Sequence, residues 1–152
     1  MLDHAIGRRT SLTGLLLPLS DRCLLLPNVA VAELIGYQFG QPAPDAPAWN
    51  LGQIAWRNQQ LPLINFEAAC GAPAVVGERA RIVVLNALGD SPLRYIALLI
   101  QGVPRSCKLD TQLSYVDVPL APLERAAVQV GEQVVKVPDL VGLERLVMAG
   151  VS

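Results

Sequence analysis

The stretch at residues 47–66 reads PAWNLGQIAWRNQQLPLINF and carries the clearest local signal in the chain. Two apolar segments, Leu51–Arg57 and Gln60–Phe66, flank the pair Asn58-Gln59, a pattern that predicts a β-hairpin with a two-residue turn. Asparagine suits such a turn because it tolerates a positive φ. The stretch therefore predicts two paired strands in the middle of the chain.

Short apolar runs punctuated by proline precede this hairpin. The runs Gly14–Leu19 and Cys23–Pro27 surround a polar break and predict another hairpin. Because these runs are continuous rather than alternating, we expect strands covered on both faces. A short turn then leads into a strand over about 31–37. Three prolines within Gln41–Pro47 favour an extended segment, and we expect Trp49 after it to fold over the core.

The second half of the sequence repeats this pattern of short strands. A short helical segment near 66–70 and a glycine- and proline-rich loop over 71–79 come first. Strands are predicted at Arg81–Ala87, at Arg94–Ile100 and near 113–118, 126–130 and 133–137, with 101–109 continuing irregularly or as a further strand. This count and spacing predict a mainly β fold of two small barrels that share a core.

The loop at 71–79 also suggests how the chain is organised. We expect one domain over residues 13–149, with approximate subdomains at 13–70 and 80–138, after a flexible arm at 1–12.

A single helix is predicted at the end of this domain. Pro138 suits a first helical position, and Gly150 suits the end of a helix. Leucine and valine residues recur along one face, whereas Glu144 and Arg145 fall on the opposite face, where we expect them to contact water.

Composition narrows the possible functions. The chain has 152 residues, of which 52% are hydrophobic and 16% charged, with a formal net charge of −1. Ordinary soluble domains carry about 25% charged residues. High hydrophobicity with low net charge argues against disorder. Without a basic excess to displace counterions, nucleic-acid binding is not expected.

Cysteine usage and apolar run lengths bear on location. Cys23, Cys70 and Cys107 form no closely spaced pair, which favours buried thiols in a reducing cytosol over a metal or redox site. An arginine pair near the N-terminus resembles an export signal, but Pro18 interrupts the apolar run that follows. No apolar run approaches the roughly 18 residues of a membrane span. We therefore expect a cytoplasmic protein without membrane insertion.

Catalytic motifs are poorly represented. The turn Gly89-Asp90-Ser91 follows a predicted strand, as a nucleophilic serine does in some esterases, but no histidine follows His4 to act as its base. Metal-binding histidine pairs and phosphate-binding loops are also missing from the sequence. The remaining candidate carboxylates are expected to be solvated: Asp110, Asp117, Glu124 and Glu132. We predict a non-catalytic binding protein without metal or cofactor.

Charged residues inside apolar strands are the candidates for binding. Glu33 lies within an apolar segment, and Arg57 follows Trp56 at the tip of the central hairpin. One interpretation is that both charged residues are the solvent-facing members of alternating strands. The other is a small charged hot spot surrounded by apolar surface, where arginine and tryptophan are favoured. Trp56 fits either the core or an interface.

Three blocks of the sequence resemble the CheW-like coupling proteins of bacterial chemotaxis. Residues 31–37, VAELIGY, are similar to the family's V-x-E-I segment. Residues 47–66 resemble its P-x-[FW]-x-x-G-x-x-N-L-R-G-x-x-[IV]-P-[IV]-[IV]-D-L block, and 82–85 with 96–103 resemble its I-V-V-L…G-[IL]-[LV]-V-D-x-V block. Four residues of the middle block keep the family's spacing without gaps: Pro47, Gly52, Arg57 and Pro62. The resemblance covers about residues 13–147.

Four positions depart from the family pattern. Trp56 stands where the family has Leu, Asn58 where it has Gly, and Asn65 and Gln101 where it has Asp. The chain therefore resembles a divergent member, which opens the hypothesis of a chemosensory array that controls type IV pili and twitching motility.

The resemblance implies two intertwined five-stranded Src-homology-3-like barrels with a short C-terminal helix. It also implies a non-catalytic adaptor that couples methyl-accepting chemotaxis receptors to the regulatory domain of a CheA-type histidine kinase. Such an adaptor is cytoplasmic, associates with membrane-bound receptor arrays, can self-associate there and uses no cofactor. Carried over by position, Glu33 and Arg57 are the expected partner contacts, with Val31 and Val103 as apolar neighbours.

A small-ligand sensor that uses the crevice between the barrels is the alternative function. Such a site is an apolar pocket with a few polar groups. Only 5% of the residues are aromatic, which speaks mildly against it.

Overall fold

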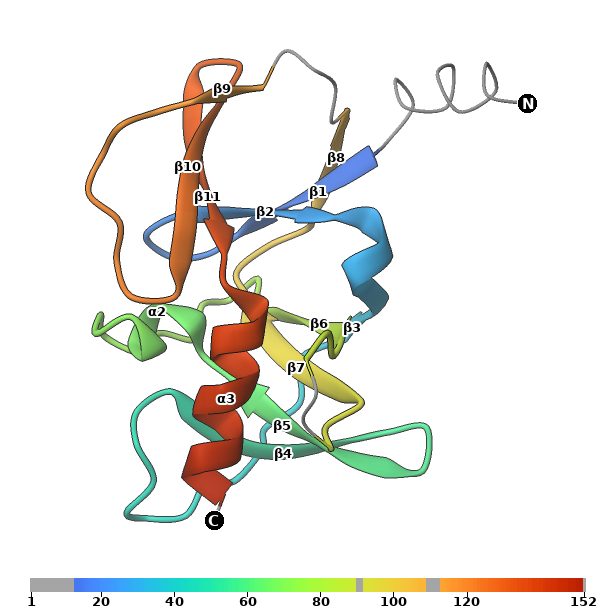
Figure 1. Ribbon diagram of the computed structural model, residues 1–152. Coiled ribbons are helices and arrows are strands. Elements are labelled where there is room, and N and C mark those ends of the chain that lie inside the picture. The colour runs from blue at the N-terminus through green and yellow to red at the C-terminus, as the bar shows by residue number, and fades with distance from the viewer. Residues whose placement is uncertain (1–12, 90–91, 109–112, 152) are drawn as a thin grey trace.

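The structure is a computed structural model that describes residues 13–89, 92–108 and 113–151, and within these ranges the chain forms two β-sheets and a C-terminal helix (Figure 1). Sheet A has the strand order β8-β1-β2-β11-β10-β9, and sheet B the order β3-β6-β7-β5-β4. The prediction of a mainly β fold is confirmed. The arm at 1–12 and the esterase-like residues Asp90 and Ser91 lie outside the described residues.

The strands of sheet A are β1 (Thr13–Pro18), β2 (Cys23–Pro27), β8 (Arg105–Lys108), β9 (Ser114–Tyr115), β10 (Glu124–Val130) and β11 (Gln133–Pro138). Those of sheet B are β3 (Val31–Gly36), β4 (Asn50–Trp56), β5 (Gln59–Ile64), β6 (Arg81–Asn86) and β7 (Tyr95–Ile100). The helical elements are η1 (Asn28–Ala30), α2 (Phe66–Ala69) and α3 (Leu140–Val151).

The two sheets are intertwined along the sequence. The chain leaves sheet A after β2, builds all of sheet B from β3 to β7, and returns to sheet A with β8. The loop between α2 and β6 therefore connects two parts of the same sheet, sheet B. Parallel pairs, β5 with β7 and β2 with β11, join segments far apart in the sequence.

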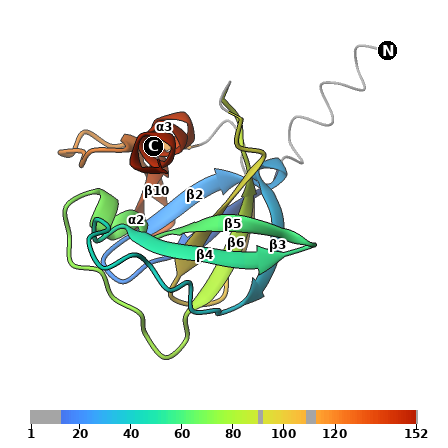
Figure 2. The same cartoon turned by 90° about the horizontal axis from the view of Figure 1, so that it is seen from below.

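Three apolar cores account for the stability of this arrangement. The shared core lies between the sheets and beneath α3, which Figure 2 shows end-on beside the strands of sheet B. It contains Leu17, Leu24, Phe66, Leu98 and Leu143. A second core lies on the other face of sheet B and a third on the other face of sheet A. Strands β2, β6 and β7 are buried along nearly their whole length because they contact a core on each face; for β2 the continuous apolar sequence predicted this.

Two glycines allow sheet B to close on itself. The backbone N–H of Gln53 in β4 donates to the carbonyl of Gly40, in the segment after β3, at 3.1 Å. A Cβ atom on Gly40 would lie 2.2 Å from the carbonyl oxygen of Leu51, and one on Gly52 would lie 2.1 Å from that of Gly40. Gly52 also has a φ of +91°. Only glycine permits so close an approach of the two backbones.

The central hairpin forms as predicted, but its turn lies one residue earlier. Trp56 pairs with Gln59, which leaves Arg57 and Asn58 as the turn residues in place of Asn58 and Gln59. Their φ angles are +48° and +63°, which is the pattern of a type I′ turn. The positive φ expected for Asn58 is confirmed, and the turn presents the Arg57 side chain at the hairpin tip.

The predicted boundaries of the last helix are wrong at both ends. Pro138 is the final residue of β11, and α3 begins at Leu140. The Asp139 carboxylate accepts a hydrogen bond from the backbone N–H of Gly142 at 3.0 Å, so this residue caps the helix. The helix continues through Gly150 to Val151.

Two carboxylates expected to contact water are buried instead. Glu144 of α3 accepts hydrogen bonds from the backbone N–H groups of Leu88 and Gly89, at 2.5 and 2.9 Å. Glu124 at the start of β10 forms ion pairs described below. In both cases the partners come from distant parts of the chain, so helical or strand periodicity could not reveal them. Arg145 is exposed, as predicted.

The three cysteines are free thiols with different degrees of burial. Cys23 is buried, whereas Cys70 and Cys107 are half-buried, so the expectation of three buried thiols holds only for the first. Burial raises the pKa of all three thiols above the ordinary value.

Candidate protein-interaction site

Three of the predicted interaction residues meet where the two edge strands of sheet B, β3 and β4, come together. The Glu33 carboxylate oxygen Oε1 accepts from Arg57 Nη2 and from Trp56 Nε1, each at 3.0 Å. The Arg57 guanidinium lies 4.6 Å from the centre of the Trp56 ring, a cation–π arrangement. Glu33 and Arg57 are 24 positions apart in the sequence. We call Glu33, Trp56 and Arg57 the Glu33 cluster.

A bulge in β3 orients Glu33 toward this cluster. Val31 pairs with Leu85 and Glu33 with Val84, so two steps along β3 match one step along β6. The extra residue moves Glu33 to the face of sheet B that carries Val84 and the second core. Val31 packs instead against the shared core on the opposite face.

Burial divides the Glu33 cluster into a fixed part and an exposed part. Trp56 is only 6% exposed, and its ring contacts the Tyr95 ring edge-on at 4.8 Å. The side chains of Glu33 and Arg57 are 39% and 66% exposed. An exposed ion pair of this kind stabilises a fold by about 0–1 kcal/mol. The pair can therefore exchange its internal contact for a partner's charges at little cost to folding.

The fifth predicted residue lies away from the Glu33 cluster. Val103 follows the end of β7 and is 60% exposed. Val31 lies beside Leu85, which pairs with Ile96 at the start of β7. Five steps along β7, about 17 Å at the usual rise per residue, separate the start of this strand, near Val31, from its end, which precedes Val103. The structure thus groups Glu33, Trp56 and Arg57, and places Val31 and Val103 elsewhere.

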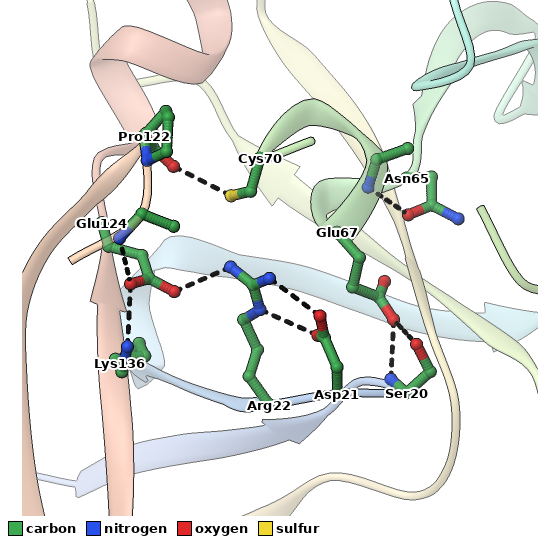
Figure 3. Close-up of polar contacts among 11 residues, drawn as sticks. Ser20, Asp21, Arg22, Asn65, Glu67, Cys70, Pro122, Glu124 and Lys136 are labelled. Atoms are coloured by element: carbon green, nitrogen blue, oxygen red, sulfur yellow. Dashed lines mark hydrogen bonds and ion pairs between the residues drawn. The ribbon is translucent and has the colours of Figure 1, made fainter. Parts of the chain in front are cut away.

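A buried group of charges, which the sequence did not predict, lies where α2 meets the turn between β1 and β2 (Figure 3). Arg22 in that turn contacts the carboxylates of Glu124 at 2.7 Å and Asp21 at 2.8 Å, and Lys136 of β11 contacts Glu124 at 2.9 Å. We call Asp21, Arg22, Glu124 and Lys136 the buried charge cluster, after the buried Glu124 side chain at its centre; Asp21 lies at its exposed rim. The guanidinium of Arg22 also lies 5.8 Å from the centre of the Phe66 ring.

The pKa values of this cluster reflect mutual stabilisation. Burial opposes ionisation of Glu124, but the N–H of Ala121 and the charges of Lys136 and Arg22 outweigh it and hold the pKa of Glu124 below its ordinary value. The Arg22 hydrogen bond lowers the pKa of Asp21, and the same bond raises that of Arg22. Asp21, Arg22 and Glu124 thus favour their charged forms more than in water.

Neighbouring polar contacts join α2 to sheet A at the same place. The buried Glu67 carboxylate accepts from the backbone N–H of Ser20 at 2.7 Å and from its hydroxyl group. The Cys70 thiol donates to the carbonyl of Pro122 at 2.8 Å. Figure 3 shows both contacts beside the buried charge cluster. These polar groups therefore hold one sheet to the other, which is a structural role.

Two of the departures from the family pattern have local structural roles. The Asn65 side chain accepts from the backbone N–H of Ala68 at 3.0 Å and so caps α2, as Asp would. Gln101 accepts from the N–H of Gly77 at 2.9 Å and donates to the carbonyl of Val75 at 2.8 Å. Both side chains therefore stabilise local backbone structure at their positions.

Neither a metal-binding cluster nor a membrane-spanning helix is found in the described part of the chain. No three of its His, Cys, Asp or Glu side chains are grouped so that they could hold a metal ion. None of its helices has the length and apolarity needed to span a membrane. The shared core fills the space between the sheets with side chains, many of them fully buried.

Comparison with known proteins agrees with this geometry. Two intertwined sheets, three cores and a C-terminal helix define the class as a double-barrel β domain. The family model described as the CheW-like domain matches residues 13–146. The chain belongs to the CheW-like domain family, which places it in general among chemotaxis coupling adaptors.

One solved structure with the same fold is the crystal structure of scaffolding protein TtCheW from Thermoanaerobacter tengcongensis. It is 16% identical in sequence, with a TM-score of 0.72, and the match covers 86% of this chain and 85% of that chain. No curated protein matches the sequence.

Proposed function

We propose that this protein is a non-catalytic adaptor that couples chemoreceptors to the regulatory domain of a CheA-type histidine kinase. The Glu33 cluster carries the proposal, because it presents an exposed ion pair beside a buried tryptophan, with Arg57 at the tip of the central hairpin. Arginine beside an aromatic anchor is typical of interface hot spots. We place the protein in the cytoplasm, at membrane-bound receptor arrays.

Coupling by such an adaptor needs no chemistry on the adaptor itself. Each interface can be weak, because many copies held in one array raise the effective concentration of every partner. Binding to one partner then changes the affinity for the other partner only if both contacts favour the same arrangement of the complex. A domain stabilised by three separate cores provides the rigid spacing that this requires.

A charge reversal at Arg57 tests the proposal. In Arg57→Glu the Glu33 ion pair becomes a repulsion on the surface, and we expect capture of the cognate kinase regulatory domain or of the receptor to fall about tenfold or more. The melting temperature should stay within about 2 °C, because the pair is exposed. The measurement is co-precipitation from lysate together with a thermal melt.

Arg94→Glu is the matched control, because Arg94 is also exposed and the charge change is the same. It should leave capture unchanged. Normal capture by Arg57→Glu would contradict the role of Arg57, and loss of capture by both variants would show only an effect of net charge.

The proposal also includes a particular pathway, in which the array controls type IV pili. It rests on the departures from the family pattern, and since Asn65 and Gln101 have local roles, Trp56 and Asn58 carry most of it. A deletion strain should lose twitching zones and keep swimming zones. Loss of swimming alone would assign the array to flagellar control instead.

A further inference from the structure

We propose that the groove where β7 leaves sheet B binds an acidic, partly aliphatic segment of a partner protein. The groove is about 700 Å³ and lies at the junction of the two sheets. Arg79 and Arg81 line one part of it, and Arg105 of β8 lines another. We call this feature the arginine groove; it is distinct from the Glu33 cluster, and the inference does not rest on the proposed function.

Charge is concentrated in this groove. Three guanidinium groups face a single carboxylate, Glu78, although the whole chain has a formal net charge of −1. Arg79 and Arg81 are exposed and form no ion pair within the described part of the chain. Arginine presents a planar fork that matches a carboxylate with two parallel hydrogen bonds. Unpaired arginines grouped in this way therefore favour an anionic partner.

Hydrogen bonds of the backbone and of side chains hold the walls of the groove in place. The N–H of Gln101 donates to the carbonyl of Pro18 at 2.8 Å, which joins sheet B to sheet A at this point. The Gln101 side chain holds the loop at Val75 and Gly77, directly before Arg79. Arg105 Nη2 donates to the Gln133 side chain at 3.3 Å. A groove fixed in advance loses less entropy when a partner binds.

The apolar residues at the groove favour a peptide over a nucleic acid. Val103 lines the groove and is 60% exposed, and Val75 and Val76 on the adjoining loop are 42% and 48% exposed. An acidic segment with aliphatic side chains would satisfy both the guanidinium groups and the valines. Single-stranded nucleic acid is bound by stacking its bases on aromatic rings, and none is among the residues that line this groove.

The test is fluorescence anisotropy of the full chain with a labelled dodecapeptide of glutamate and leucine, at about 50 mM salt. We expect saturable binding that weakens about fivefold or more in Arg79→Glu/Arg81→Glu. A peptide with glutamine in place of glutamate should not bind. The matched pair Arg94→Glu/Arg145→Glu, with both residues exposed and outside the groove, should bind the peptide as the unmodified chain does.

Several outcomes would overturn the inference. These are absence of peptide binding, equal binding of the glutamine peptide, equal weakening in the matched pair, or tighter binding of a single-stranded oligonucleotide. Circular dichroism melts of both double variants establish that the fold is intact. Arg57→Glu should keep peptide binding, so failure of the Glu33 cluster proposal and failure of this one are distinguishable.

Discussion

The Glu33–Arg57 pair on sheet B and the buried charge cluster beneath α2 use the same kinds of side chain in opposite surroundings. Both Glu33 and Arg57 are substantially exposed, whereas the Glu124 side chain is 1% exposed and contacts both Arg22 and Lys136. Removing one partner from a buried pair leaves a desolvated charge uncompensated, whereas an exposed charge is compensated by water. The comparison assigns a structural role to the buried charge cluster and leaves the Glu33–Arg57 pair available for binding.

The largest effect should come from breaking the buried charge cluster. Glu124→Ala leaves Lys136 without its partner and Arg22 with Asp21 alone, and it should reduce the free energy of unfolding by about 3–5 kcal/mol. Urea titration followed by circular dichroism measures the change. A loss no larger than that of an exposed pair would show that the cluster is effectively solvated and would remove the contrast.

Acid should weaken the same cluster with a smaller, graded effect. The pKa of Glu124 in the folded state is below the ordinary value of 4.5, so its stabilising contribution is present above that pH and is lost as the pH falls through the folded-state pKa. We expect the free energy of unfolding to decrease below about pH 4.5. In Glu124→Gln this acid dependence should be shallower. Identical pH profiles for the two proteins would contradict the assignment.

The smallest effect on folding is expected at the exposed pair. Glu33→Gln keeps the shape of the side chain and a hydrogen-bond acceptor for Trp56, so it should cost only about 0.2–1 kcal/mol of unfolding free energy. It should still weaken partner capture, as Arg57→Glu does. A loss comparable to that of Glu124→Ala would mean that Glu33 is a structural residue, and the proposed site would lose its support.

Much of the local structure follows from sequence periodicity. The continuous apolar run at Cys23–Pro27 correctly predicted a strand covered on both faces, and the apolar sequence at Arg94–Ile100 correctly predicted a strand. The central hairpin was predicted because its turn and flanking strands are contiguous, although its turn is shifted by one residue. Glu33 and Arg57 could be singled out as charges within apolar segments, but the hydrogen bond between them could not.

The sequence by itself determined a mainly β domain of short apolar strands, its central hairpin and the residues that resemble the CheW-like family. Only the tertiary structure decided which charges are buried and which are presented. Arg22 and Glu124 are 102 positions apart, and Ser20 and Glu67 are 47 apart. The burial pattern along one strand or helix follows from the period of that element. Contacts between residues so far apart in the sequence depend instead on how the chain leaves sheet A and returns to it.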